Sequence, residues 1–220
     1  MVLNNQTDVA VVKPAFIDYL AFHVLCLKQI PEYHGMILNG LYGFRKMIAA
    51  VDVCYAKKDI AIAAAVVFRN FADKRPESTY STRVNQFREY IPGQFYKRVL
   101  PCLMAVLTKI DEKLDTVIID GYVMLGDKPG LGYYLWEKLG EKASVIGVAK
   151  TVFKDAYSVK IFRGKSNKPL YITSIGIDPV SAAENISKMH GSYRIPKLLK
   201  QVDSLAKERI KKVFRVFFNS

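Results

Sequence analysis

Apolar residues along the chain repeat with two periods, which predict an alternation of strands and helices. Two apolar runs on either side of a polar turn predict a strand hairpin over 46–55 and 60–69. Apolar residues spaced three and four apart predict helices, which we place at 14–30, 94–112, 131–139, 181–190 and 198–217. Shorter runs predict further strands, which we place at 80–89, 116–120, 144–149, 157–163 and 169–173.

The order of these elements predicts the fold class. An early hairpin followed by alternating helices and short apolar strands is typical of an α/β domain with a mixed sheet. A chain of 220 residues, half of them apolar, can bury the core of one domain. We therefore expect a single domain over 1–220, with an N-terminal arm and helix in 1–45 and a basic C-terminal helix in 197–220.

The charge of the chain favours a polyanionic partner. The formal net charge is +13, and residues 188–220 hold nine Lys or Arg and two acids, so this tail carries +7 of it. Clustered positive charge binds phosphates and releases their counterions, which indicates DNA or RNA. The alternative is that the charge serves solubility alone.

Other features bound the cellular context. Cys26, Cys54 and Cys102 are an odd number of widely spaced cysteines in apolar segments, which indicates reduced core thiols. The N-terminus lacks the pattern of a secretory signal, and the longest apolar run, 60–68, is too short to span a bilayer. We expect a cytoplasmic monomer without a membrane partner.

Two aspartates at unusual positions are candidates for chemistry. Asp52 interrupts an apolar strand, and Asp120 ends another, followed by Gly121. A carboxylate within an apolar strand is costly unless it is paired or bound to metal, and the carboxyl edge of an open α/β sheet is where ligands bind. Two such oxygen donors suit Mg²⁺. Alternatively, Asp52 lies on a solvated strand face and Asp120 caps a turn.

Six segments together resemble the endonuclease V family, over roughly 44–208. They are Val51-Asp52-Val53, Tyr90 to Val99, Ile119-Asp120-Gly121, Ile146 to Lys150, Pro169 to Ile177, and Tyr193 to Pro196 with Val202-Asp203. The resemblance implies a ribonuclease H-like mixed sheet flanked by helices. It also implies Mg²⁺- or Mn²⁺-dependent cleavage of DNA or RNA near deaminated purines such as hypoxanthine, with Asp52 and Asp120 as metal ligands.

The same comparison shows departures from the family pattern. Val99 stands where the family has a catalytic glutamate, and Gly176 or Ile177 stands where it has a histidine. Asp178 follows directly and is a candidate replacement, with the alternative that it caps the next helix. Lys150 resembles the family's lysine near the scissile phosphate, with the alternative of a solvated strand end.

The segments that bind nucleic acid in the family are retained. Tyr90, Ile91, Pro92 and Gly93 resemble the wedge that enters beside a flipped base, and an apolar wedge offsets part of the cost of unstacking. Gly121 resembles the glycine that lets the backbone approach this base. We also expect Arg98 to be part of the nucleic-acid-binding surface. The alternative for Tyr90 is that it is an ordinary core residue at a strand end.

Three functions follow from these observations. The first is an endonuclease V-like nucleic-acid-binding protein of the DNA-repair type, whose cleavage is weak or lost because two site residues are missing. The second is an active, divergent nuclease using Asp52, Asp120 and Asp178 with Mg²⁺ or Mn²⁺. The third is a non-catalytic assembly or interaction protein. The retained wedge and the basic surface favour the first, so whether the chain is an enzyme stays open.

Overall fold

A computed structural model describes residues 46–56, 60–85, 91 and 93–218, and the side chains of helix α6 as far as Val213 together with that of Arg215. Lys46–Ser220 forms one compact unit. The predicted helix over 14–30 lies outside the described residues, as does the rest of 1–45. The expectation of a single domain over 1–220 therefore stays a prediction.

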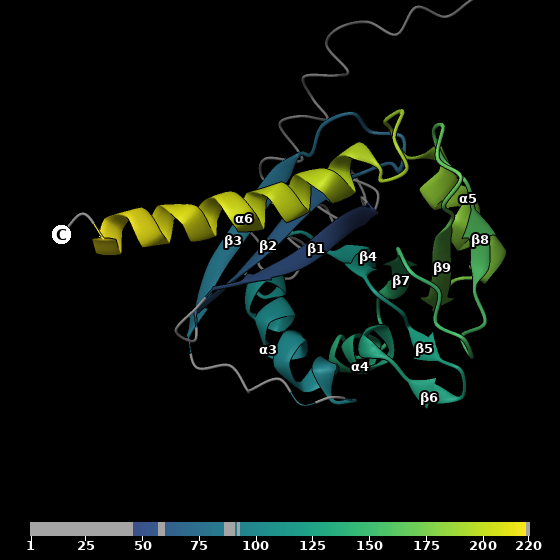
Figure 1. Cartoon of the computed structure of the whole chain (residues 1–220), viewed down its shortest axis with the longest axis horizontal. Helices are drawn as coiled ribbons and strands as arrows, with labels where there is room; N and C mark the ends of the chain where they lie inside the picture. The colour runs from purple at the N-terminus through teal and green to yellow at the C-terminus, as the bar shows by residue number, and fades with distance from the viewer. Residues whose placement is uncertain (1–45, 57–59, 86–90, 92, 219–220) are drawn as a thin grey trace, which may run out of the picture. The chain divides into compact units, whose positions relative to one another are not determined.

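Seven strands form one mixed sheet in the order β3-β2-β1-β4-β7-β9-β8, as Figure 1 shows. The strands are β1 (Met47–Tyr55), β2 (Ile60–Phe68), β3 (Ser78–Asn85), β4 (Leu114–Asp120), β7 (Ser144–Ala149), β8 (Val159–Ile161) and β9 (Leu170–Ile175). β1, β4 and β7 run parallel, and the remaining pairs are antiparallel. The α/β class with a mixed sheet is thus confirmed, and the predicted hairpin of 46–55 with 60–69 occurs as the β1–β2 pair.

Helices cover both faces of this sheet. α3 (Phe95–Leu107) and α4 (Leu131–Lys138) lie on one face, and α5 (Pro179–Lys188) and α6 (Lys197–Phe218) lie on the other (Figure 1). β2 is rich in alanine, and its small side chains let α3 and α6 approach it from opposite sides. Strand residues alternate between the two cores, so Ile118 faces α6 and Ile119 faces α3.

Several element boundaries differ from the predicted ones, and one hairpin was not predicted. α3 ends at Leu107 rather than 112, because the backbone turns at Thr108. β3 begins two residues before the predicted strand, at Ser78. A small hairpin of β5 (Met124–Leu125) and β6 (Lys128–Pro129) occupies a segment in which the apolar pattern predicts no strand.

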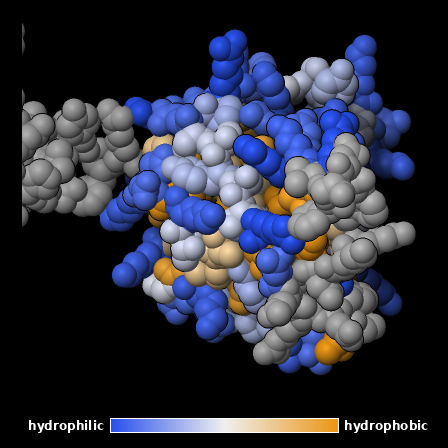
Figure 2. All heavy atoms as spheres, turned by 90° about the vertical axis from the view of Figure 1, so that its left-hand side faces the viewer, coloured by the Kyte–Doolittle hydropathy of each residue, from blue (hydrophilic) through white to orange (hydrophobic). Residues whose placement is uncertain are grey.

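α6 crosses β1 and β2, and its C-terminal turns extend beyond the sheet (Figure 1). The face of the molecule toward which this end points is mostly hydrophilic, with scattered apolar residues (Figure 2). Within the described residues, every helix is too short or too polar to cross a bilayer.

Candidate active site

The strand register brings Asp52 and Asp120 together. Val51 of β1 pairs with Ile119 of β4 in parallel, and each is followed by its aspartate where this pairing ends. Neighbouring strands lie about 4.8 Å apart. Since Val51 and Ile119 belong to the core beside α3, alternation turns both aspartates toward α6. The register therefore places the two acids on neighbouring strands at the carboxyl edge of the sheet, where both line one cavity.

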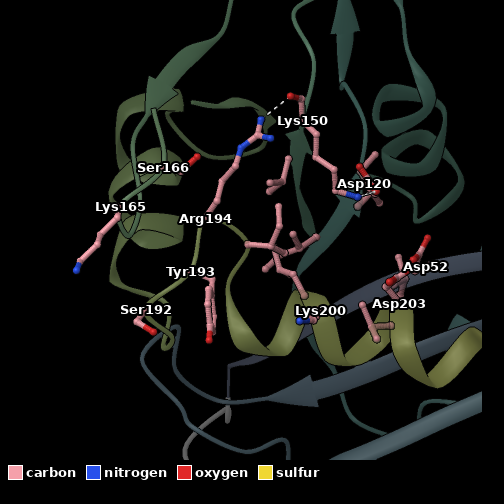
Figure 3. Close-up of a pocket in the computed structure, with 17 residues that line it drawn as sticks. Asp52, Asp120, Lys150, Lys165, Ser166, Ser192, Tyr193, Arg194, Lys200 and Asp203 are labelled. Atoms are coloured by element: carbon pink, nitrogen blue, oxygen red, sulfur yellow. Dashed lines mark hydrogen bonds and ion pairs between the residues drawn. The ribbon is translucent and has the colours of Figure 1, made fainter. Parts of the chain in front are cut away.

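A third carboxylate reaches this edge from α6. Asp203 lines the same cavity as Asp52 and Asp120, and Figure 3 shows it beside Asp52. Lys207, one turn further along the helix, lies 2.7 Å from an Asp203 carboxylate oxygen. The sequence comparison includes Asp203 in a matching segment but gives it no role. Its signal in the sequence is an acid on the otherwise apolar face of an amphipathic helix.

The three carboxylates interact electrostatically. The pKa of Asp52 is raised from 3.8 to about 6, mainly by burial and in smaller part by the negative charges of Asp120 and Asp203. The backbone N–H of Val53 donates to Asp52 Oδ1 at 2.8 Å, and this bond and the Lys150 charge act in the opposite direction. An acid held among acids in this way is a site that favours a cation.

Lys150 supplies a positive charge at this site. It follows β7 directly, and its ammonium group forms an ion pair with Asp120 Oδ2. Its carbonyl oxygen accepts a hydrogen bond from the Arg194 guanidinium, which also donates to the Pro169 carbonyl at 2.6 Å. Arg194 belongs to the loop between α5 and α6, so that loop fixes the backbone that carries Lys150 (Figure 3).

These groups line one end of a cavity of about 750 Å³. A second hollow of about 300 Å³ lies on the α3 side of the same sheet edge, and Asp52, Asp120 and Val99 all line it. Val99 is 5 % exposed. In this arrangement the apolar side chain of Val99, on α3, occupies a position beside two carboxylates.

Comparison with known proteins identifies the family. The sequence model of the family described as Endonuclease V matches residues 36–171, which is more than half of the chain. The chain belongs to the endonuclease V family. Endonuclease V of Trichormus variabilis is 26 % identical over 189 residues, covering 74 % of this chain and 82 % of that protein. The protein of that name from Streptomyces avermitilis is 28 % identical over 188 residues, covering 74 % and 80 %.

Solved structures agree on the fold. The crystal structure of endonuclease V from Streptomyces avermitilis superposes with a TM-score of 0.64 at 24 % identity, covering 78 % of this chain and 84 % of that one. Ciona intestinalis endonuclease V, crystallised with a 24mer DNA containing an inosine followed by a ribo-adenosine, gives 0.62 at 18 % identity, covering 76 % and 87 %.

The structure does not bring Asp178 to the endonuclease V site. Ile175 at the end of β9 pairs with Val145 at the start of β7, so the segment that follows lies at the opposite edge of the sheet from Asp120. There Asp178 caps α5 and accepts the Ser181 N–H at 2.8 Å, an interaction that lowers its pKa. The candidate role of Asp178 in a metal site is therefore withdrawn, and capping accounts for this residue.

The same edge holds the position expected for the family's histidine. Gly176 has a φ of +77°, and a Cβ there would lie 3.1 Å from the Ser144 backbone, at the start of β7. Neither Gly176 nor Ile177 lines the cavity of the carboxylates. A histidine at either position would be separated from Asp52 by the length of β7, about 10 Å or more.

Part of the predicted wedge is described. Tyr90 and Pro92 lie outside the described residues, whereas Ile91 is 48 % exposed and precedes a turn that Gly93 makes with a φ of +78°. Gly121 has a φ of +143°, and a Cβ on it would meet nothing within 4 Å. Open space beside Gly121 leaves room for a ligand next to Asp120.

Arg98 has a contact within the protein. Its guanidinium carbon lies 4.2 Å from the centroid of the Tyr55 ring, at the end of β1. This cation–π contact holds Arg98 beside the hollow that Tyr55 and Val99 line. This contact does not test the predicted role of Arg98 in nucleic-acid binding, which stays a prediction.

The donor set suits a hard divalent cation in kind, because it consists of carboxylate oxygens. Among the residues that the structure describes, no group of three acids, histidines or cysteines is already close enough to enclose an ion. The Lys150 ammonium bound to Asp120 occupies part of that space. A cation bound by Asp52 and Asp120 would compete with this ion pair.

Proposed function

We propose that this chain is an endonuclease V-type protein that binds DNA or RNA at the carboxyl edge of its sheet and cleaves it slowly or not at all. The observation that carries the proposal is the group of Asp52, Asp120 and Asp203, of which the two strand aspartates also lie beside a buried Val99. The carboxylates retain a place for Mg²⁺ or Mn²⁺, while an apolar side chain occupies the position of the family's glutamate.

Three residues would hold the cation, namely Asp52, Asp120 and Asp203. When bound, Mg²⁺ activates a water and stabilises the leaving oxygen in phosphodiester cleavage. Lys150 would place its ammonium group near the phosphate, since it lies at the mouth of the same cavity on a backbone that Arg194 holds. Inosine-containing nucleic acid is the proposed substrate, as the family relation suggests.

Loss of a carboxylate at Val99 accounts for weak cleavage. A side chain without oxygen cannot ligate a cation or orient a water, and loss of one group that acts in the transition state commonly costs orders of magnitude in rate. Binding depends on other features, namely the positive charge and the exposed Ile91 beside Gly93, so it does not require the glutamate.

The polyanion would also meet the exposed side of α6. Lys207, Arg209, Lys211, Lys212 and Arg215 are exposed, and Glu208 is the one acid among 207–215. Such a surface binds phosphates without regard to sequence. It would supply affinity while the sheet edge supplies the reaction site.

A specific observation supports the alternative of an active nuclease. Asp203 brings a third carboxylate to the site from a different element than the one that carries Val99. Active cleavage by Asp52, Asp120 and Asp203 would then proceed without a glutamate. A non-catalytic assembly role is the remaining alternative.

One experiment separates these functions. The purified chain is incubated with an end-labelled, inosine-containing strand in Mg²⁺ or Mn²⁺, and both binding and nicking are measured. We expect binding at low salt with slow nicking or none, and any nicking should be lost in Asp120→Asn. Fast nicking by the wild type would favour the active nuclease, and absence of binding at low salt would favour the assembly role.

A further inference from the structure

The large cavity extends well beyond the carboxylates. Its other end is lined by Lys165, Ser192, Tyr193 and Lys200, which come from the β8–β9 turn, the α5–α6 loop and the start of α6 (Figure 3). A volume of about 750 Å³ is within the range of pockets that hold small organic ligands. Hydroxyl groups, cations and an aromatic ring at this end differ in chemistry from the acidic end.

Tyr193 supplies the aromatic ring of this group, and its side chain is largely exposed. It is 73 % exposed, and the Lys200 ammonium lies 5.8 Å from the centroid of its ring. A large aromatic side chain left in water contributes little to the core, whereas its open face can stack on a base. The ring and the cation together suit a base joined to a phosphate.

The backbone that presents Tyr193 is held rigidly by Arg163. This guanidinium is 7 % exposed and donates to carbonyl oxygens of 187–194, among them Met189, Gly191 at 3.3 Å and Tyr193 at 3.1 Å. Burial of a guanidinium is costly unless its donors are satisfied. Since the carbonyls of one loop satisfy them, folding of this loop is tied to burial of Arg163.

Close backbone approach adds to this fixation. Gly164 follows Arg163 with a φ of +60°, and a Cβ there would lie 2.2 Å from the Ser192 carbonyl oxygen. Only glycine permits this contact. The β8–β9 turn and the loop before α6 therefore form one unit, in which Ser192 and Tyr193 have fixed places.

Arg194 connects this unit with the reaction site. Its side chain turns inward, opposite to that of Tyr193, and donates to the carbonyls of Lys150 and Pro169 (Figure 3). Lys150 in turn pairs with Asp120. The backbone that carries Tyr193 thus has a defined position relative to the carboxylates, which a substrate that spans both ends of the cavity would require.

We propose that the Tyr193 end of the cavity is a binding subsite for one unpaired nucleotide adjacent to the nucleotide that lies at the carboxylates. The base stacks on the Tyr193 ring, and its phosphate lies near Lys200. This inference rests on the proposed function, because it requires that the strand passes along the carboxyl edge of the sheet. Single-stranded DNA and RNA share this chemistry, since a base must be unpaired to stack on a side chain.

The test is the affinity of three variants for short labelled oligonucleotides, measured by fluorescence anisotropy in EDTA so that cleavage is excluded. Tyr193→Ala removes the ring, and Tyr193→Phe keeps it. Tyr157→Ala is the matched control, because Tyr157 is 87 % exposed and lies outside this cavity. Each variant is measured with single-stranded DNA, single-stranded RNA and duplex DNA of one sequence.

The expected result is a loss of about 5- to 100-fold in single-strand affinity for Tyr193→Ala, the range that one stacked base contributes. Tyr193→Phe and Tyr157→Ala should bind as the wild type does, and duplex affinity should change little. The polymer with the larger loss, DNA or RNA, is the one that the subsite accommodates better.

Failure of the subsite and failure of the proposed function give different results. If the wild type binds single strands and Tyr193→Ala binds them equally well, the subsite is refuted while the proposed function stands. An equal loss in Tyr157→Ala, or an equal loss for duplex, also refutes the subsite. If the wild type binds no oligonucleotide at low salt, the proposed function is refuted together with the subsite.

Discussion

Replacement of Asp52 by Asn is expected to stabilise the protein, although the residue belongs to the candidate site. In the folded chain the pKa of Asp52 is raised from 3.8 to about 6, first by burial and then by Asp120 and Asp203. A carboxyl group whose folded pKa is raised binds its proton more tightly in the folded state. Its ionisation therefore costs stability as pH rises from about 4 through 6, and the full cost applies above that window.

The magnitude follows from the size of the shift. A change from 3.8 to about 6 corresponds to at most about 3 kcal/mol at neutral pH. Partial exposure of Asp52 reduces this value to roughly 1–3 kcal/mol, because solvent screens part of the penalty. Asn keeps an oxygen that can accept the Val53 N–H, so the substitution removes the charge and little else.

The assay is urea unfolding of wild type and Asp52→Asn in EDTA, followed by the fluorescence of Trp136, the single tryptophan of the chain. The variant should be more stable at about pH 8 and equal to the wild type at about pH 4. Asp111→Asn, a change at an exposed acid after α3, is the control and should have no effect at either pH. Equal stability of Asp52→Asn and wild type at pH 8 would refute the reasoning that the carboxylates repel each other in a poorly solvated site.

Three further predictions concern other parts of the molecule. Asp178→Ala should leave nicking and binding unchanged but lower the stability measured by urea unfolding. The hydrogen bond from Ser181 lowers the pKa of Asp178 in the folded chain, so the stability that this carboxylate contributes is present above its ordinary pKa and is lost as pH falls. A change in nicking would return Asp178 to the site. Substitution of Lys211, Lys212 and Arg215 by Gln should lessen the slope of log affinity against log salt by about 0.9 for each phosphate that is no longer neutralised, and an unchanged slope would exclude α6 from the interface. Val99→Glu should melt at a lower temperature than the wild type in EDTA and recover with Mg²⁺, because a carboxylate there would repel Asp52 and Asp120 until a cation is bound; recovery without metal would contradict this reasoning.

Much of the fold could be predicted from local patterns. The 144–149 strand and the pairing of 46–55 with 60–69 follow from apolar runs that only a buried strand accommodates. The position of Asp120 could also be predicted, because an acid at the end of an apolar parallel strand lies at the carboxyl edge whatever the loops do. The small β5–β6 hairpin could not, since two-residue strands have no periodicity.

The errors about the site have a common physical cause. The order of motifs in the family predicts that Ile177 and Asp178 lie near the carboxylates. However, β9 runs antiparallel to β7, so the residues after β9 lie at the edge of the sheet opposite to Asp120. Strand direction is a property of the whole sheet, which local spacing does not report. Asp203 could not be recognised for the converse reason, because only packing of α6 across β1 places it beside Asp52.

The measurement that tests the central claim most directly is the nicking rate of Val99→Glu on an inosine-containing strand in Mg²⁺, beside the wild type and Val99→Gln. Glutamate adds a carboxylate where Val99 meets Asp52 and Asp120, while Gln has the same size without the charge. We predict slow or absent cleavage by the wild type and Val99→Gln, and a clear gain for Val99→Glu. Fast cleavage by the wild type, or a folded Val99→Glu that binds the strand and never cuts it, would contradict the account.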